Sequence, residues 1–245
     1  MVNIKIPNAV KKLLPFRLAS AVYYSGKAEL ASSRSFSRDR SRISSYLTAV
    51  NRPRLQIGAG SNLLDGWLNT DYFPDGADLI HLDATRRFPF PDSSFDLIFS
   101  EHVIEHVPLV GGVSMIAEAF RVLRPGGRLR LSTPPLEFLL DGYRNPESGL
   151  NGTYRAWHFE IYNPDSPSKA PVVLFNDYVR MWGHVFIYDA ALLSSLMVEA
   201  GFVEVQRCAI GESDEPLLVG LENEGRMPDG LLRLSTMSIE GKKPI

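Results

Sequence analysis

The sequence predicts an α/β fold, a mostly parallel sheet covered by helices on both faces. Short apolar or alternating runs that end in small or polar residues recur at residues 54–58, 67–71, 78–83, 95–100 and 127–133. Helical patterns alternate with strand patterns later in the chain, which is typical of parallel sheets. The length of 245 residues suits one well-buried domain rather than two.

Two helices are expected around the later strands. Residues 113–123 place their apolar side chains on one helical face, and the glycines after Pro125 end that helix. A second helix begins at Asp189, a good N-cap residue, and ends at Gly201, and the run FVEVQR continues as a strand. After an excursion over residues 211–230, the tail LSTMSIEGKKP is predicted to supply the last, antiparallel strand.

Two features do not fit the alternating pattern. Arg128 and Arg130 share one face of a strand that should be buried, so we expect them to extend to the surface or to lie under a thin cover. Residues 134–183 form a long irregular insertion in this interpretation, and such insertions are usually functional. A lid is therefore expected at about residues 135–183. Its aromatic residues suit either stacking on a ligand or a core within the lid.

Charge is distributed unevenly along the chain. The net charge of -2 argues against a dedicated nucleic-acid binder. Residues 1–54, however, hold eleven Lys or Arg and only two acidic residues. We expect residues 1–52 to form a basic helical extension and linker before a main domain at residues 53–245. Such an arm is usually a solvated extension, and it also suits weak contact with an anionic membrane or a phosphorylated substrate.

The cysteine content and the hydropathy predict a cytoplasmic protein. The single cysteine, Cys208, cannot form an internal disulfide. No apolar stretch has the length or the flanks expected of a spanning helix or a signal peptide.

Small or acidic residues follow the first four predicted strands. Gly58-Ala59-Gly60 follows the first, where glycine lets the backbone turn sharply and approach a ligand. Asp71 ends the second strand and Asp83 the third, and such carboxylates suit the hydroxyls of a ribose and the amino group of an adenine. The fourth ends at Ser100-Glu101-His102. Because ligands bind beyond the carboxyl ends of parallel strands, these residues predict a site for an adenosine-containing cofactor.

Three segments resemble a known family. The conserved motifs of class I S-adenosylmethionine-dependent methyltransferases are similar to these three segments, which read LQIGAGSNLLDGWLNTD, HLDATRRFPFPDSSFDLIFSEHVIEHV and RVLRPGGRLRLSTP. The resemblance covers residues 54–134 and continues in YDAALLSSLMVEAGFVEV at 188–205. It implies a Rossmann-like, seven-stranded, mostly parallel sheet with an antiparallel last strand. It also implies S-adenosylmethionine as the cofactor and a methyltransferase domain over residues 53–245.

The resemblance implies roles for individual residues. Those that would bind the cofactor stand at the strand ends: Ile57, Gly58, Ala59, Gly60, Asp71, Tyr72, Asp83, Ala84, Ser100 and Glu101. The glycine loop would approach the amino-acid part of the cofactor, and Asp71 its ribose. Asp83 with Ala84 would bind the adenine, and Ser100 with Glu101 would lie beneath the methionine carboxylate and the sulfonium.

Other interpretations of these residues stay open. Gln56 replaces an acid that the family usually has, and Asn62 replaces a third glycine. The short segment between the glycine loop and Asp71 resembles that of a branch of the family that has GW(I/L)N(V/T)D in place of a full first helix. A nicotinamide dehydrogenase needs GxGxxG and an acid about 20 residues on, which this chain fits poorly. A catalytically silent scaffold is the second alternative, because these motifs hold the cofactor rather than perform chemistry.

Methyl transfer to a hydroxyl also needs a base, and histidine suits that role near neutral pH. His184 is the first candidate and His102 the second. His102, Glu105 and His106 form HxxEH, whose spacing also suits a divalent metal ion. The same sequence serves capping and packing in metal-free relatives, so a metal is allowed by the pattern but is not expected.

The acceptor is predicted to be a sugar, a glycan or another small hydroxyl compound. This prediction rests on the resemblance of the short GW segment to enzymes of bacterial surface polysaccharides and secondary metabolism. N-methylation of a small amine is the nearest alternative. No specific nucleic acid is expected, because the predicted main domain is acidic.

Overall fold

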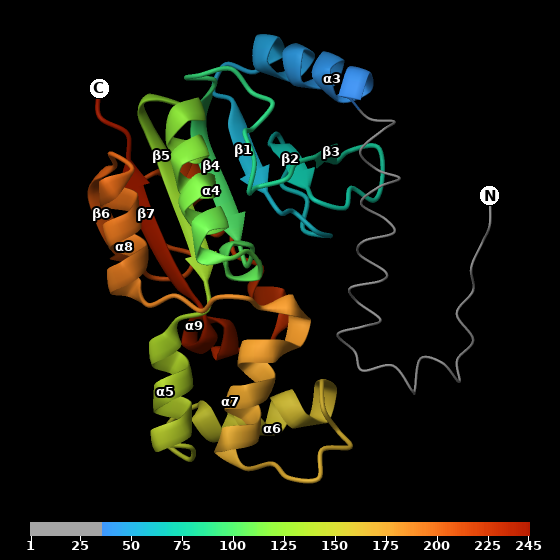
Figure 1. Cartoon of the computed structure of the whole chain (residues 1–245), viewed down its shortest axis with the longest axis vertical. Coiled ribbons are helices and arrows are strands. Elements are labelled where there is room, and N and C mark those ends of the chain that lie inside the picture. The colour runs from blue at the N-terminus through green and yellow to red at the C-terminus, as the bar shows by residue number, and fades with distance from the viewer. Residues whose placement is uncertain (1–35) are drawn as a thin grey trace, which may run out of the picture.

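The computed structural model describes residues 36–245 (Figure 1). Most of the basic extension, its expected helices and its expected contact with a membrane or a phosphorylated substrate lie outside the described residues. The described end of the extension is the helix α3 (Phe36–Ala49). The Tyr46 hydroxyl accepts a hydrogen bond from the Arg54 amide at 3.0 Å, and Arg42 donates to the Leu79 carbonyl at 3.0 Å. These bonds fasten α3 to the sheet. No helix in residues 36–245 is long and apolar enough to cross a bilayer.

Seven strands of the described region form one sheet in the order β3-β2-β1-β4-β5-β7-β6. They are β1 (Arg54–Ile57), β2 (Leu68–Asp71), β3 (Ile80–His81), β4 (Phe95–Glu101), β5 (Leu123–Thr133), β6 (Val203–Cys208) and β7 (Met237–Lys242). β1 to β5 pair in parallel, whereas β7 is antiparallel to both β5 and β6. The predicted fold class is confirmed, including the antiparallel last strand.

A turn over residues 58–67, rather than a helix, joins β1 to β2. Gln56 is buried on β1 and donates through Nε2 to the Asn62 carbonyl at 2.9 Å. Its Oε1 accepts from the Leu64 amide at 3.3 Å. Gln56, one of the two positions that depart from the family pattern, therefore holds this turn through backbone groups of residues 62 and 64.

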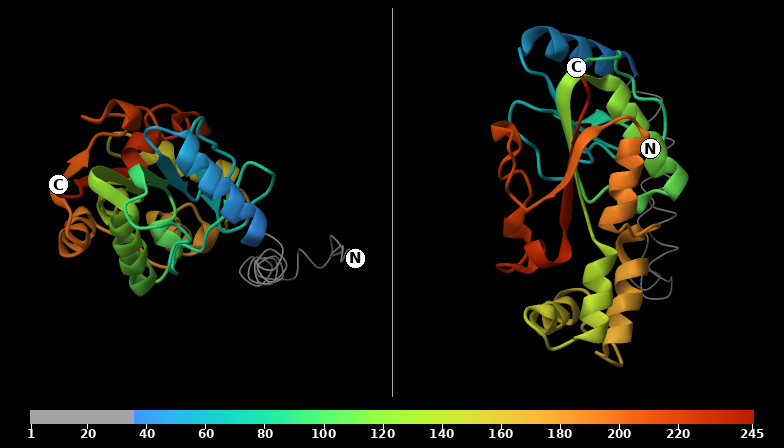
Figure 2. Two further views of the ribbon diagram at one scale, coloured as in Figure 1. Left: turned by 90° about the horizontal axis from the view of Figure 1, so that it is seen from above. Right: turned by 90° about the vertical axis from the view of Figure 1, so that its left-hand side faces the viewer.

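The two faces of the sheet are covered differently (Figure 2). On one face, α4 (Leu109–Val122) and α8 (Ala190–Glu199) pack against the strands in the main core. α8 begins as predicted, because Asp189 Oδ1 accepts from the Leu192 amide at 2.7 Å. On the other face lie residues 209–236, which contain the short turns η3 (Pro216–Leu218) and η4 (Glu224–Arg226) and the helix α9 (Leu231–Ser235). A smaller core on this face joins Trp67, Leu97, Phe99 and Leu218.

Arg130 lies in β5 and is fully buried, so both expectations for it, extension to the surface and a thin cover, are wrong. Its guanidinium donates to Glu222 at 2.6 Å, to Glu240 at 2.5 Å and to two backbone carbonyls of the covering segment. Glu222 also accepts hydrogen bonds from two buried serine hydroxyls. Arg130 thus fastens residues 209–222 to β5 and β7. Arg128 keeps partial exposure and lies 3.6 Å from Glu204.

The insertion after β5 is helical, so the expectation of an irregular segment is wrong. It contains α5 (Leu136–Arg144), α6 (Asn151–Ile161), α7 (Pro171–Arg180) and the single turn η2 (Met181–Gly183), beyond the carboxyl ends of the strands (Figure 1). Phe138, Tyr154 and Tyr178 meet edge to face, with ring centroids 4.8 to 5.5 Å apart for the Phe138 pairs. These buried rings give the insertion a core of its own.

Candidate functional site

A cavity of about 650 Å³ opens at the carboxyl ends of β1, β2 and β3. Seven of the ten predicted cofactor-binding residues line it: Ile57, Gly58, Gly60, Asp71, Tyr72, Asp83 and Ala84. A hollow of similar volume between α3 and residues 80–91 contains none of the ten. The structure therefore brings together most of the residues that were predicted at the strand ends.

The two glycines of the glycine loop differ in the space available for a side chain. Gly58 has a φ of +71°, and a Cβ built on it would lie 2.1 Å from a methyl carbon of Val103. Gly60 has a φ of +52°, but a Cβ there would meet nothing within 4 Å. Ala59, between them, is buried and does not line the cavity, and its amide donates to the Thr70 carbonyl at 2.8 Å. Glycine is required at position 58 by both conformation and space.

Asp71 joins the glycine loop to the end of β2. Its Oδ2 accepts from the Gly60 amide at 2.9 Å, and its Oδ1 accepts from the Phe73 amide at 2.8 Å. A carboxylate offers about four acceptor positions, so two remain for a ligand in the cavity. The bracing of the loop by Asp71 was not predicted from the sequence.

Asp83 shapes the turn after β3. Its Oδ1 accepts from the amide and the hydroxyl of Thr85, at 3.0 and 2.6 Å, and its Oδ2 pairs with Arg86 at 3.1 Å. Arg86 is largely exposed, so this pair is screened by water.

Ser100 and Glu101 do not line the cavity. Ser100 is buried in β4, and Glu101 turns toward the covering segment, where it pairs with Arg226 at 3.0 Å. Burial raises the pKa of Glu101, and the charge of Arg226 opposes that rise. Their contact with the methionine end of a cofactor stays a prediction.

His102 lines the cavity and is held at both ring nitrogens. Nδ1 lies 3.0 Å from Glu105 Oε1, and Nε2 lies 2.9 Å from the Thr236 hydroxyl. Its backbone has a φ of +53°, a strained conformation for a residue with a Cβ. Trp182, which also lines the cavity, is strained in the same way, with a φ of +56°. Strain of this kind is concentrated at functional sites.

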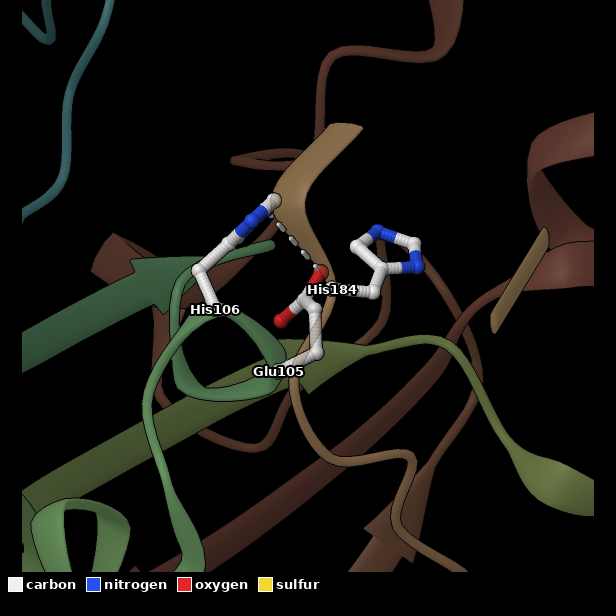
Figure 3. A group of neighbouring side chains, drawn as sticks. All are labelled: Glu105, His106 and His184. Atoms are coloured by element: carbon white, nitrogen blue, oxygen red, sulfur yellow. Dashed lines mark ion pairs between the residues drawn. The ribbon is translucent and has the colours of Figure 1, made fainter. Parts of the chain in front are cut away.

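Glu105 lies behind His102 in η1 (Ile104–His106) and is fully buried. Thr133 donates to its Oε2 at 2.9 Å. Burial alone would raise the pKa of Glu105, but the hydrogen bond and charge of His102 and the charge of His106 lower it to about 2. Glu105 is therefore an anion surrounded by histidines (Figure 3).

His184 reaches this group from the end of the insertion. Its Nδ1 lies 2.7 Å from the Tyr178 carbonyl, which only accepts hydrogen bonds, so Nδ1 carries the proton and Nε2 presents a lone pair. Burial lowers the pKa of His184, while the charge of Glu105 opposes that effect. The rings of His184 and His106 are 5.0 Å apart. The sequence placed His102, Glu105 and His106 together, and the structure adds His184.

Further cavity residues were missed by the sequence analysis. They are Phe73, Leu82, Thr85, Val103, Val107, Pro108, Trp182 and Gly183. Most are neighbours of predicted residues, so position along the chain was the available signal. Trp182 and Gly183 come from the insertion, whose aromatic content alone pointed to them.

Comparison with known proteins finds a family match for the segment that supplies most of the cavity lining. The family model described as a methyltransferase domain matches residues 55–131. A probable S-adenosylmethionine-dependent methyltransferase of Mycolicibacterium smegmatis is 48% identical over 48 residues, which are 20% of this chain and 18% of that protein. A probable methyltransferase of Arabidopsis thaliana is 37% identical over 60 residues, 24% of this chain and 10% of that protein. The chain thus spans less than a fifth of the length of either curated relative.

Solved structures of low sequence identity also resemble the chain. A SAM-dependent methyltransferase from Archaeoglobus fulgidus is 15% identical, with a TM-score of 0.46, over 94% of this chain and 100% of that one. The match to the methyltransferase domain model is confined to residues 55–131, which carry the glycine loop, both cavity carboxylates and the HxxEH run.

Proposed function

We propose that the chain is an S-adenosylmethionine-dependent methyltransferase and that the cofactor binds in the cavity at the ends of β1 to β3. The observation that carries this proposal is that the glycine loop, Asp71 and Asp83 line one cavity within the segment that matches the methyltransferase domain. The family resemblance supplies the identity of the cofactor.

The cavity residues suit the parts of this cofactor. The loop at Gly58 and Gly60 leaves room for close approach of the amino-acid end, and Asp71 has acceptor positions for two ribose hydroxyls. Asp83 and Ala84 would face the adenine. Trp182 and Gly183 would close the far wall, which gives the insertion the role of a lid.

The acceptor is a sugar, a glycan or another small hydroxyl compound in this proposal. The bond from the methyl carbon to the sulfonium sulfur breaks as a bond to the acceptor oxygen forms, and S-adenosylhomocysteine leaves as a neutral thioether. The hydroxyl proton passes to Nε2 of His184, which carries the lone pair because Nδ1 donates to the Tyr178 carbonyl. His184 does not itself line the cavity but directly follows Gly183, which does. His102 suits the base role less well, because both of its ring nitrogens are engaged.

Calorimetric titration of the protein with S-adenosylmethionine, S-adenosylhomocysteine and NADH tests the cofactor first. We expect the first two to bind with dissociation constants on the order of micromolar and NADH not to bind. Binding of none of them by a folded protein would favour the silent scaffold. Transfer of a radiolabelled methyl group to a panel of sugars, small phenols and amines would then separate O-methylation from N-methylation.

His184→Ala tests the proposed base. We expect turnover to fall about 100-fold or more while S-adenosylhomocysteine binding is kept, because proton removal and not cofactor binding is lost. The matched control is His81→Ala, since His81 is a partly exposed histidine outside the cavity lining. Loss of cofactor binding in His184→Ala would instead show a structural role.

A further inference from the structure

We propose that the indole of Trp182 binds the positively charged sulfonium of S-adenosylmethionine through a cation–π interaction. The inference rests on the proposed function and deepens it, because it assigns to one side chain the recognition of the charge that distinguishes the cofactor from its product. A cation is attracted to the negative face of an aromatic ring, and tryptophan makes the strongest contact of this kind.

The position of Trp182 in the cavity points to the reacting end of the cofactor. Tyr72 and Phe73 also line the cavity, but they follow Asp71, which is assigned to the ribose. Trp182 instead adjoins His184, the proposed base, with ring centroids 5.5 Å apart. A base must lie within about 3 Å of the hydroxyl whose proton it takes. The indole therefore lies near the end of the cavity where the methyl group is transferred.

The charges of the cavity lining suit a π face at this position. Among the described residues that line the cavity, the carboxylates are Asp71 and Asp83, which follow β2 and β3. Glu101 lies outside the lining and pairs with Arg226 at 3.0 Å. No carboxylate of the described lining comes from the insertion, so the indole is the group there that attracts a cation. A sulfonium has no N–H or O–H to donate, which makes an aromatic face a suitable partner.

Four aromatic rings hold the indole of Trp182 in place. Its ring centroid lies 5.0 Å from that of Tyr162, 5.6 Å from Tyr178, 5.8 Å from His158 and 5.5 Å from His184. The first three pairs are nearly perpendicular, which is a favourable geometry for aromatic rings. The indole is consequently ordered before a ligand binds, and little conformational entropy is lost on binding.

The backbone that carries this ring is strained and firmly held. Trp182 has a φ of +56°, a conformation that a bulky residue rarely adopts. Directly after its turn, the amides of Val185 and Phe186 donate to the Glu105 carbonyl at 2.8 and 3.1 Å. A strained conformation persists only where the surrounding structure fixes it, and such strain is concentrated at functional sites. The strain is accounted for if this conformation is what places the indole at the cavity.

The contact depends on the methylation state of the cofactor. The sulfur of S-adenosylmethionine carries a positive charge, whereas that of S-adenosylhomocysteine is neutral. The indole therefore favours the methylated form, and the attraction ends once the methyl group has been transferred. Trp182 is in this way a specificity-determining residue for the charge at sulfur.

Calorimetric titration of the full chain with S-adenosylmethionine and, separately, with S-adenosylhomocysteine tests the inference. Trp182→Leu should weaken binding of the first about three- to tenfold and change binding of the second less than about twofold. Trp182→Phe keeps a smaller aromatic face and should give an intermediate ratio of the two dissociation constants. The matched control is Trp157→Leu, because Trp157 is a partly buried tryptophan of the insertion that does not line the cavity. This variant should keep the wild-type ratio.

Two outcomes would overturn the inference. One is equal weakening of both ligands in Trp182→Leu, which would make the indole a wall without charge recognition, and the other is unchanged binding of both. Circular dichroism checks that the variants fold. Binding of neither ligand by the wild-type chain would contradict the proposed function and this inference with it. Binding of both with a ratio that Trp182→Leu leaves unchanged would contradict the inference alone.

Discussion

Gly58 and Gly60 share a left-handed backbone, but only Gly58 lacks space for a side chain. In both alanine variants the left-handed backbone should lower the free energy of unfolding by about 1 to 2 kcal/mol. In Gly58→Ala it should fall by about 1 to 3 kcal/mol more, because Val103 must move. Denaturant unfolding measures this difference. The double variant Gly58→Ala/Val103→Ala should recover part of the added loss, and equal effects of the two single variants would contradict the assignment.

Asp71 is expected to hold both the glycine loop and the ribose. Asp71→Ala should weaken binding of S-adenosylhomocysteine at least about tenfold in a calorimetric titration, since two backbone amides and two hydroxyls lose their acceptor. The matched control is Asp75→Ala, because Asp75 is an exposed acid in the loop after β2 and does not line the cavity. Unchanged affinity in Asp71→Ala would remove the ribose role.

Single residues near the strand ends were predictable because their positions follow from local sequence. Each predicted cofactor-binding residue of the cavity ends a parallel strand or lies within three residues after its end, and parallel strands bring such residues to one edge of the sheet. His184 is different, since its approach to Glu105 depends on two backbone bonds across the fold. No spacing in the sequence encodes that contact.

The packing of residues 209–222 on β5 depends on one buried cation, the guanidinium of Arg130. Arg130→Met should lower the free energy of unfolding by about 3 to 5 kcal/mol, because Glu222 and Glu240 would stay buried without their partner. Arg124→Met, in the same strand but paired with the partly exposed Asp96, should cost at most about 1 kcal/mol. Denaturant unfolding of the two variants checks this. Similar losses would mean that the buried pairs are not the cause.

The elements were predicted with unequal success. α8 was recognisable because a capping aspartate and a terminal glycine mark its ends. The helices of the insertion were missed, because their aromatic residues pack on one another rather than on the sheet. Arg130 was misjudged because its two partners are far away in the sequence, at Glu222 and Glu240.

Within residues 36–245 the main sheet core and the core of the insertion are separate clusters, and the cavity is lined by residues of both parts. Binding of S-adenosylhomocysteine should therefore slow amide hydrogen exchange at residues 58–60, 71–73 and 83–85, and also at residues 182 and 183. Exchange in α3, at the other end of the sheet, should not change. Protection confined to the strand ends would show that the insertion does not close on the cofactor.

The topology of the whole molecule was predictable because the family motifs fix the order of the parallel strands. The paths of the covering segments were not, since residues 209–236 contain only short turns and one helix of five residues. Their position is decided by the charges buried beneath them, which local propensity does not reveal.

The order of the sheet also bears on how the protein is made. β7 lies between β5 and β6 but follows both in the chain, so it is the last of the three to leave the ribosome. Until then β5 and β6 each present an open edge, which is a template for pairing with other chains. The growing chain is consequently most vulnerable to aggregation before β7 is made, and a chain stopped before residue 237 would leave one edge of β5 and both edges of β6 unpaired.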